Sequence, residues 1–194
     1  TNTQRLIKYH HKAVDPPVLL QKLQFAHRER PDLWHAWSAL VVQFGHMGRL
    51  DDALATASEA SRRFAHLPRT WLDLASAHKW RKEADAEITA AQRAFEINPS
   101  WNHSAVVLAG ALERQGRLED ARQVYERALR HVPLDARLHA SHANLLWRLR
   151  RNGDCFTAIE KALRLAPGYE WAWGLLLDWA AHLGEEHRAT RFAR

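Results

Sequence analysis

A 34-residue period runs along this chain of 194 residues. Steps of 34 residues in either direction from one alanine reach another alanine each time, and prolines, glycines and tryptophans recur at the same interval. The alanines are Ala26, Ala60, Ala94, Ala128 and Ala162. A period of this length is typical of arrays in which each unit buries its apolar face against its neighbours. The register begins near residue 17 and continues to the end of the sequence without an insertion.

Each period contains two helix-like runs joined by a turn. In the run 33–44, bulky apolar residues lie at the i, i+3, i+4 and i+7 positions of one helix face. They are Trp37, Leu40, Val41 and Phe44. After the turn 45–49, the run 50–64 places the small residues Ala53, Ala57 and Ala60 on one face. Small residues let two helices approach closely, so we predict an all-α fold in which each second helix packs on the first helix of its own period and on that of the next.

This pattern resembles the tetratricopeptide repeat, a helix pair of 34 residues with set positions for tryptophan, leucine, alanine, glycine and proline. The first-helix positions match Trp71, Leu74 and Ala75, and the second-helix positions match Gly116, Ala121, Tyr125, Ala128 and Pro133. The run "ARQVYERALRHVP" is also similar to the shorter half-a-TPR motif of RNA-processing scaffolds. The resemblance implies a right-handed solenoid of about five antiparallel helix pairs. Repeats are expected near 34–67, 68–101, 102–135 and 136–169, with partial repeats at 17–33 and 170–194 after an N-terminal segment, 1–16.

Two turns depart from the repeat pattern. Lys82 and Arg150 stand where the turn glycine is expected, and Gly153 follows Arg150 three residues later. A glycine in this place ends a helix because it adopts a left-handed conformation easily. We therefore expect the helix before Arg150 to run one turn longer than its counterparts.

Charge and cysteine content bound the partner and the compartment. The net charge is +6 and the chain holds 13 histidines besides, which favours an acidic partner. The single cysteine, Cys155, excludes an internal disulfide and favours a reducing compartment, so we expect a cytoplasmic location. No apolar run approaches the ~20 residues of a membrane span, and residues 1–15 lack the apolar core of a signal peptide.

No catalytic motif is present in the sequence. Neither a phosphate-binding glycine loop, nor a dinucleotide fingerprint, nor a nucleophile elbow occurs. His139, His142 and Cys155 are conceivable metal ligands, and Cys155 is a conceivable nucleophile. We favour packing roles for all three, because no fourth ligand and no activating group accompanies them. We therefore expect a non-enzymatic protein with no catalytic residue, no metal and no cofactor.

Two rows of basic and aromatic residues follow the repeat along the first helices. The row near the start of these helices is His35, Arg69, His103, Arg137 and Trp171. The row eleven residues further on is His46, Trp80, Arg114, Arg148 and His182, with Trp147 beside it. In the family that the chain resembles, these positions line the concave surface on which peptides bind. The lysine and asparagine clamp of chaperone-tail binders and the asparagine ladder of sugar-transferase relatives are absent here.

The rows predict a binding scaffold. We expect them to hold an acidic protein segment, or one that ends in a carboxylate, through arginine–carboxylate pairing and tryptophan contact area. RNA or another polyanion, with tryptophan stacking on bases, is an alternative. A regulatory or substrate-presenting domain of a larger enzyme is another. The sequence does not indicate the oligomeric state.

Overall fold

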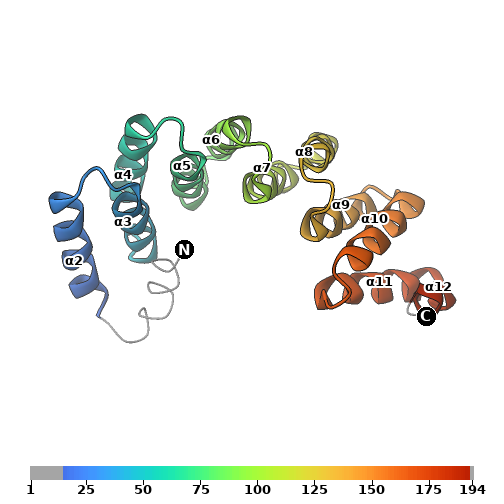
Figure 1. The fold of residues 1–194 in the computed structure, drawn as a ribbon. Helices are drawn as coiled ribbons and strands as arrows, with labels where there is room; N and C mark the ends of the chain where they lie inside the picture. Colours follow the sequence, from blue (N-terminus) through green and yellow to red (C-terminus); the bar gives the residue numbers. More distant parts are fainter. Residues whose placement is uncertain (1–14, 193–194) are drawn as a thin grey trace. The chain divides into compact units, whose positions relative to one another are not determined.

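A computed structural model of the chain describes residues 15–192, and every regular element among them is an α-helix. Figure 1 shows the helices in chain order. They are α2 (Pro16–Glu29), α3 (Trp34–His46), α4 (Leu50–Arg63), α5 (Pro68–Trp80), α6 (Ala84–Ile97), α7 (Asn102–Arg114), α8 (Leu118–His131), α9 (Ala136–Arg148), α10 (Asn152–Leu165), α11 (Glu170–Leu183) and α12 (Glu186–Phe192). The predicted N-terminal segment 1–16 lies almost wholly outside the described residues.

The helix bounds follow the period of the sequence. The first helices α3, α5, α7, α9 and α11 begin 34 residues apart, at residues 34, 68, 102, 136 and 170. The predicted class, an all-α solenoid of antiparallel helix pairs, is thereby confirmed. The exact division into repeats remains a prediction. None of the helices between residues 15 and 192 is long and apolar enough to cross a membrane.

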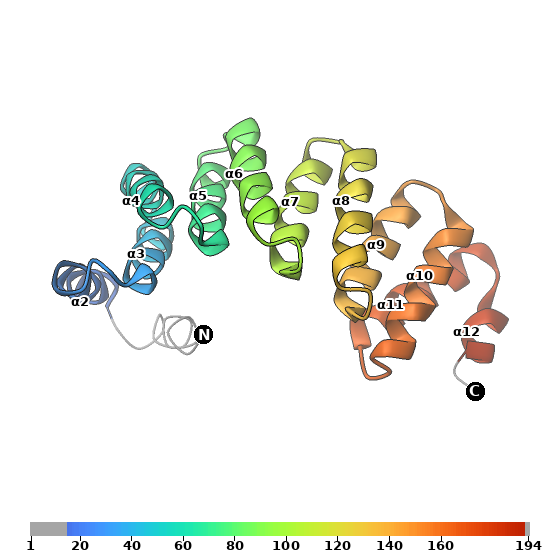
Figure 2. The ribbon, with the colours of Figure 1, turned by 45° about the horizontal axis from the view of Figure 1, so that its top comes forward.

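The chain forms two compact units, which meet in sequence between Asn98 and Pro99. Unit 1 contains α2–α6, and unit 2 contains α7–α12. Within each unit the first helices form one layer and the second helices the other, as Figure 2 shows. α4 contacts both α3 and α5, and α8 contacts both α7 and α9. Each of these second helices therefore packs on two successive first helices, as the sequence predicts.

Alanines occupy the places where the helices approach most closely. Ala53 and Ala57 of α4 and Ala121 and Ala128 of α8 have no exposed surface. A methyl group is the largest side chain that such a contact accommodates without moving the helix axes apart. The alanine register read from the sequence is thus the seam between the two layers.

All five turns within the helix pairs end the first helix in the same way. A residue one or two places after the helix has a positive φ: 70° at Gly48, 72° at Gly116 and 70° at Gly184, but also 62° at Lys82 and 59° at Arg150. In each turn the next amide donates to a carbonyl five residues earlier, which is the bond of a Schellman motif. The expected extra turn before Arg150 was wrong, because Arg150 itself adopts the left-handed conformation and α9 ends at Arg148.

Several tryptophans tie a first helix to the loop before it. The indole Nε1–H groups of Trp37, Trp71 and Trp173 each donate to a carbonyl six residues earlier, at 2.9, 2.9 and 2.7 Å. At the same repeat position His139 Nε2 lies 2.9 Å from the Pro133 carbonyl oxygen. A buried indole needs such a partner, so these tryptophans serve the fold first.

Candidate binding face

In unit 1 the predicted row residues are largely engaged in contacts of their own. The Nε–H of Arg69 donates to Asp73 Oδ1 at 2.9 Å, and the Asp73 side chain is only 5% exposed. Burial raises the pKa of Asp73, while the charge of Arg69 acts in the opposite direction. His35 stacks on Trp34 with ring centroids 3.6 Å apart. Arg69 is thus paired with a carboxylate that the sequence rows do not contain.

Trp80 lies against the backbone of the neighbouring first helix. A Cβ atom added at Gly45 of α3 would come within 2.4 Å of the Trp80 ring, so the indole occupies the space that the glycine leaves. The rest of Trp80 packs on the apolar residues around Leu40 and Val41. Its main contact is therefore between α3 and α5, and a part in ligand binding remains a prediction.

In unit 2 the starts of the first helices form a pocket of about 330 Å³, here called the amino-end pocket. It brings together three predicted residues, His103 of α7, Arg137 of α9 and Trp171 of α11. The other lining residues are Asn102, Val106, Ser141 and Tyr169. The two helices at its floor are tied together, because Asn102 Nδ2–H donates to Asp135 Oδ2 at 2.6 Å. The other oxygen of Asp135 caps α9 by accepting from the Leu138 amide at 2.9 Å.

The amino-end pocket presents a cation and an aromatic face to solvent. Arg137 is exposed and makes no ion pair or hydrogen bond with any residue that the structure describes. The Trp171 side chain is 44% exposed, and its ring lies 5.9 Å from that of Tyr169. An exposed indole next to an uncompensated guanidinium suits an acidic ligand with some apolar surface.

A second pocket of about 600 Å³ lies at the other ends of α9 and α11 and is called the carboxyl-end pocket. Its lining residues are Leu118, Trp147, Arg148, Arg150, Asp178, Trp179 and His182. The rings of Trp147 and Trp179 stack with centroids 5.3 Å apart and planes 14° from parallel. His182 meets Trp147 edge-on at 5.6 Å. Eleven helical residues separate Arg137 from Arg148, which places the two pockets ~16 Å apart along α9.

Arg148 of the carboxyl-end pocket is paired with a carboxylate. Its guanidinium contacts Glu113 of α7, whose side chain is only 16% exposed and also hydrogen-bonds Tyr125. Burial raises the pKa of Glu113, although the neighbouring Arg148 opposes the shift. Arg114, the next row residue, lines neither pocket; its Nη1 atom lies 3.6 Å from the position of a Cβ on Gly110.

The rows overlooked Glu113 because it stands one residue before Arg114. One period plus one residue separates Glu113 from Arg148, and that spacing was the available signal. The rows also overlooked Arg150 and Asp178. Arg150 lies in a turn and Asp178 four residues before His182, so the eleven-residue step reaches neither.

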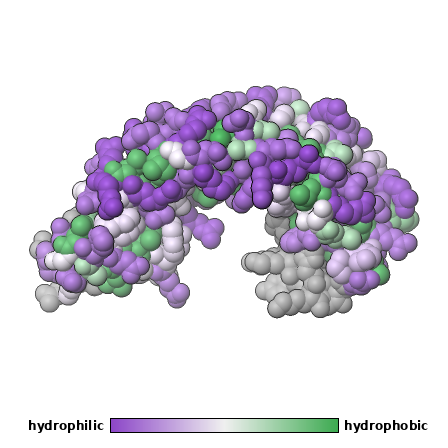
Figure 3. Space-filling view, turned by 180° about the vertical axis from the view of Figure 1, so that it is seen from behind, coloured by the Kyte–Doolittle hydropathy of each residue, from purple (hydrophilic) through white to green (hydrophobic). Residues whose placement is uncertain are grey.

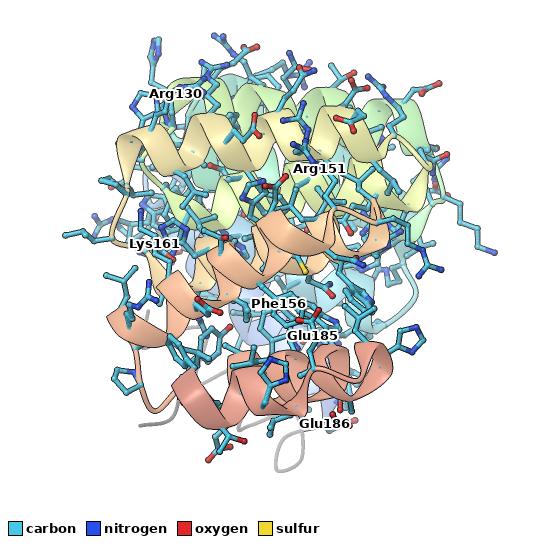
Figure 4. All side chains as sticks on the ribbon, turned by 90° about the vertical axis from the view of Figure 1, so that its right-hand side faces the viewer. Arg130, Arg151, Phe156, Lys161, Glu185 and Glu186 are labelled. Carbon is cyan, nitrogen blue, oxygen red and sulfur yellow. The ribbon has the colours of Figure 1, made fainter. Side chains whose placement is uncertain are left out.

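The residues considered for metal binding lie elsewhere, between α8, α9 and α10. Cys155 is fully buried, and its thiol donates to the Asn152 carbonyl at 3.1 Å. Burial lowers the pKa of His142 to about 4, and its Nε2 has no hydrogen-bond partner among the described residues. Within residues 15–192 no group of three or more His, Cys, Asp or Glu side chains could hold a metal ion. Figure 4 shows Arg151 and Lys161 at this side of unit 2.

Comparison with known proteins supports the repeat assignment. A sequence model described as tetratricopeptide repeat matches residues 102–145. PilF of Pseudomonas aeruginosa superposes with a TM-score of 0.71 at 14% identity, over 98% of this chain and 87% of its own. A thermophilic tetratricopeptide repeat protein of Thermus thermophilus gives 0.66 at 16% identity, over 91% and 96% of the two chains. YrrB, described as a tetratricopeptide repeat protein with an unusual peptide-binding site, gives 0.61 at 13% identity, over 88% and 87%.

Proposed function

The chain belongs to the tetratricopeptide repeat family, and on that basis we propose that it is a non-catalytic scaffold whose unit 2 binds an acidic segment of a partner protein. The observation that carries the proposal is the amino-end pocket, where Arg137 is exposed without an ion pair to any described residue and lies beside the exposed ring of Trp171. A ligand carboxylate there would gain a bidentate, charge-assisted pair without displacing an internal one. The peptide-binding site of YrrB supports peptide binding as a use of this fold.

The spacing of the two pockets sets the length of the segment. An extended chain covers about 3.3–3.6 Å per residue, so the ~16 Å between Arg137 and Arg148 corresponds to roughly five residues. Small residues such as Ser141 and Gly110 lie on the first helices between the ends and leave room for a backbone. We therefore expect a binding motif of five to seven residues with an acidic group at the amino-end pocket.

A polyanion is a less suitable ligand for the same face. Asp178 lines the carboxyl-end pocket, and Glu113 is paired with Arg148 at its edge. Phosphates in series would meet these carboxylates, whereas a peptide carries its charges singly and offers amide donors between them. In the view of Figure 3, hydrophilic residues cover most of the surface and apolar ones form scattered patches, so this view does not favour a broad apolar docking site.

A fluorescence polarisation assay tests this function. The probe is a fluorescein-labelled, amide-capped nonapeptide of alternating Glu and Ser, and a nine-residue oligouridylate is the competing ligand class. Arg137→Gln and Trp171→Ala should each weaken peptide binding by about tenfold, the effect of losing one charged pair or one aromatic contact. Arg130→Gln is the matched control, because it removes the same charge from α8, where Figure 4 shows the side chain directed outward.

Two results would count against the proposal. An equal loss in Arg130→Gln would mean that net charge rather than the pocket drives association. Tighter binding of the oligouridylate, with a steep decrease as salt rises, would favour the polyanion function.

A further inference from the structure

Arg150 occupies a backbone position that disfavours any side chain. Its φ is 59°, and the equivalent residues Gly48, Gly116 and Gly184 are glycines at φ near 70°. An L residue in this conformation brings its Cβ close to the following carbonyl, which glycine avoids. A strained residue of this kind is a reason to ask what its side chain does.

The side chain of Arg150 lines the carboxyl-end pocket and is not used by the fold. Its two arginine neighbours both have partners: Arg148 pairs with Glu113, and Arg151 with Asp154 at 2.9 Å. Arg150 is exposed and makes no ion pair or hydrogen bond to another side chain within residues 15–192. A guanidinium held in a pocket without an internal carboxylate is available to one supplied by a ligand.

The rest of the pocket indicates what else the ligand carries. The stacked indoles of Trp147 and Trp179, with His182 at their edge, form an aromatic wall. Such a wall favours a second aromatic ring, by offset or edge-to-face contact. Asp178 also lines the pocket, is exposed, and has no cationic partner in the described part of the chain. A carboxylate there accepts hydrogen bonds from peptide amides and repels a second negative charge.

We propose that Arg150 is a specificity-determining residue, and that the carboxyl-end pocket binds an aromatic side chain adjacent to a single carboxylate in the partner segment. Trp147 contacts the aromatic ring, Arg150 pairs with the carboxylate, and Asp178 accepts from the backbone between or beside them. This inference rests on the proposed function, because the same segment continues to the amino-end pocket. It adds a second element to the motif: an aromatic–acidic pair about five residues from the first acidic group.

Arg150→Gly separates binding from folding. The change removes the guanidinium and restores the residue found in three equivalent turns, so the variant should unfold at a higher temperature than the natural chain. Arg150→Asn is a second variant, since asparagine tolerates the left-handed conformation and carries no charge. Lys82→Gly is the matched control, because it makes the same kind of change in the corresponding turn of unit 1.

The probes are three amide-capped heptapeptides with Gly and Ser flanks, whose central pairs are Phe-Glu, Phe-Gln and Ala-Glu. Binding to the full chain is followed by the intrinsic fluorescence of the tryptophans. The natural chain and Lys82→Gly should bind the Phe-Glu peptide at least about tenfold more tightly than the other two. Arg150→Gly and Arg150→Asn should lose this preference for Phe-Glu over Phe-Gln while keeping that for Phe-Glu over Ala-Glu.

The inference is overturned if Arg150→Gly binds the Phe-Glu peptide as tightly as the natural chain, or if the natural chain does not distinguish the three peptides. Either result leaves the proposed function standing when the Glu-Ser nonapeptide still binds and still responds to Arg137→Gln. Loss of both the heptapeptide and the nonapeptide signals would refute the proposed function as well.

Discussion

Lys82→Gly should stabilise the protein although it removes a side chain and adds no contact. Lys82 has a φ of 62° and lies in the turn after α5. Its side chain is exposed, and the turn is held by backbone bonds, Lys82 N–H to the Lys79 carbonyl and Glu83 N–H to the His78 carbonyl, both at 3.0 Å. Neither bond depends on the lysine side chain, so the substitution changes only the conformational preference of residue 82.

Two opposing terms set the magnitude. A left-handed L residue costs about 1–2 kcal/mol, which glycine avoids. Glycine is more flexible in the unfolded chain, which costs about 0.5–1 kcal/mol. The net gain in the free energy of unfolding should be about 0.5–1 kcal/mol, or ~1–4 °C in Tm for a chain of this length.

Urea unfolding and thermal unfolding followed by circular dichroism measure this effect, with Lys79→Gly as control. Lys79 is exposed in the last turn of α5, where glycine replaces lysine at an ordinary helical φ and should lose up to about 1 kcal/mol. The same chemical change thus has opposite signs three residues apart. Gly116→Ala gives the reverse test, because a Cβ there meets no atom within 4 Å and only the φ of 72° opposes it. If Lys82→Gly destabilises the chain as Lys79→Gly does, the assigned turn geometry is wrong.

Three other substitutions test the packing. Ala128→Trp at the fully buried seam should cost roughly 1–3 kcal/mol or more and lower the melting temperature by circular dichroism. Gly45→Ala should cost a similar amount, because its Cβ would lie 2.4 Å from the Trp80 ring, whereas Gly153→Ala, with open space around its Cβ, should be tolerated. His142→Leu should stabilise the fold increasingly as pH falls below 6.5. Burial lowers the pKa of the folded imidazole to about 4, so the stability of the natural chain declines between those two pH values, by up to roughly 3 kcal/mol, and urea titrations at pH 5 and 8 measure the difference.

The repeat itself was legible in the sequence. Alanine at every 34th residue predicts helix pairs whose close contacts recur, because only small side chains permit that approach. The burial of Ala128 and the contact of α8 with α7 and α9 agree with this prediction. The same register placed His103, Arg137 and Trp171 on one face, and the structure brings all three into one pocket.

Side-chain pairing and turn geometry required the tertiary structure. A period groups residues by position along the chain, but it does not show which charges lie within bonding distance. Arg69 and Arg148 belong to rows without carboxylates, yet Asp73 and Glu113 pair with them from adjacent positions on the helix surface. Arg150 was expected to lengthen a helix, because its residue type disfavours a left-handed conformation. The tertiary structure holds it there because the start of α10 is fixed by packing on α9, and the turn has to close between them.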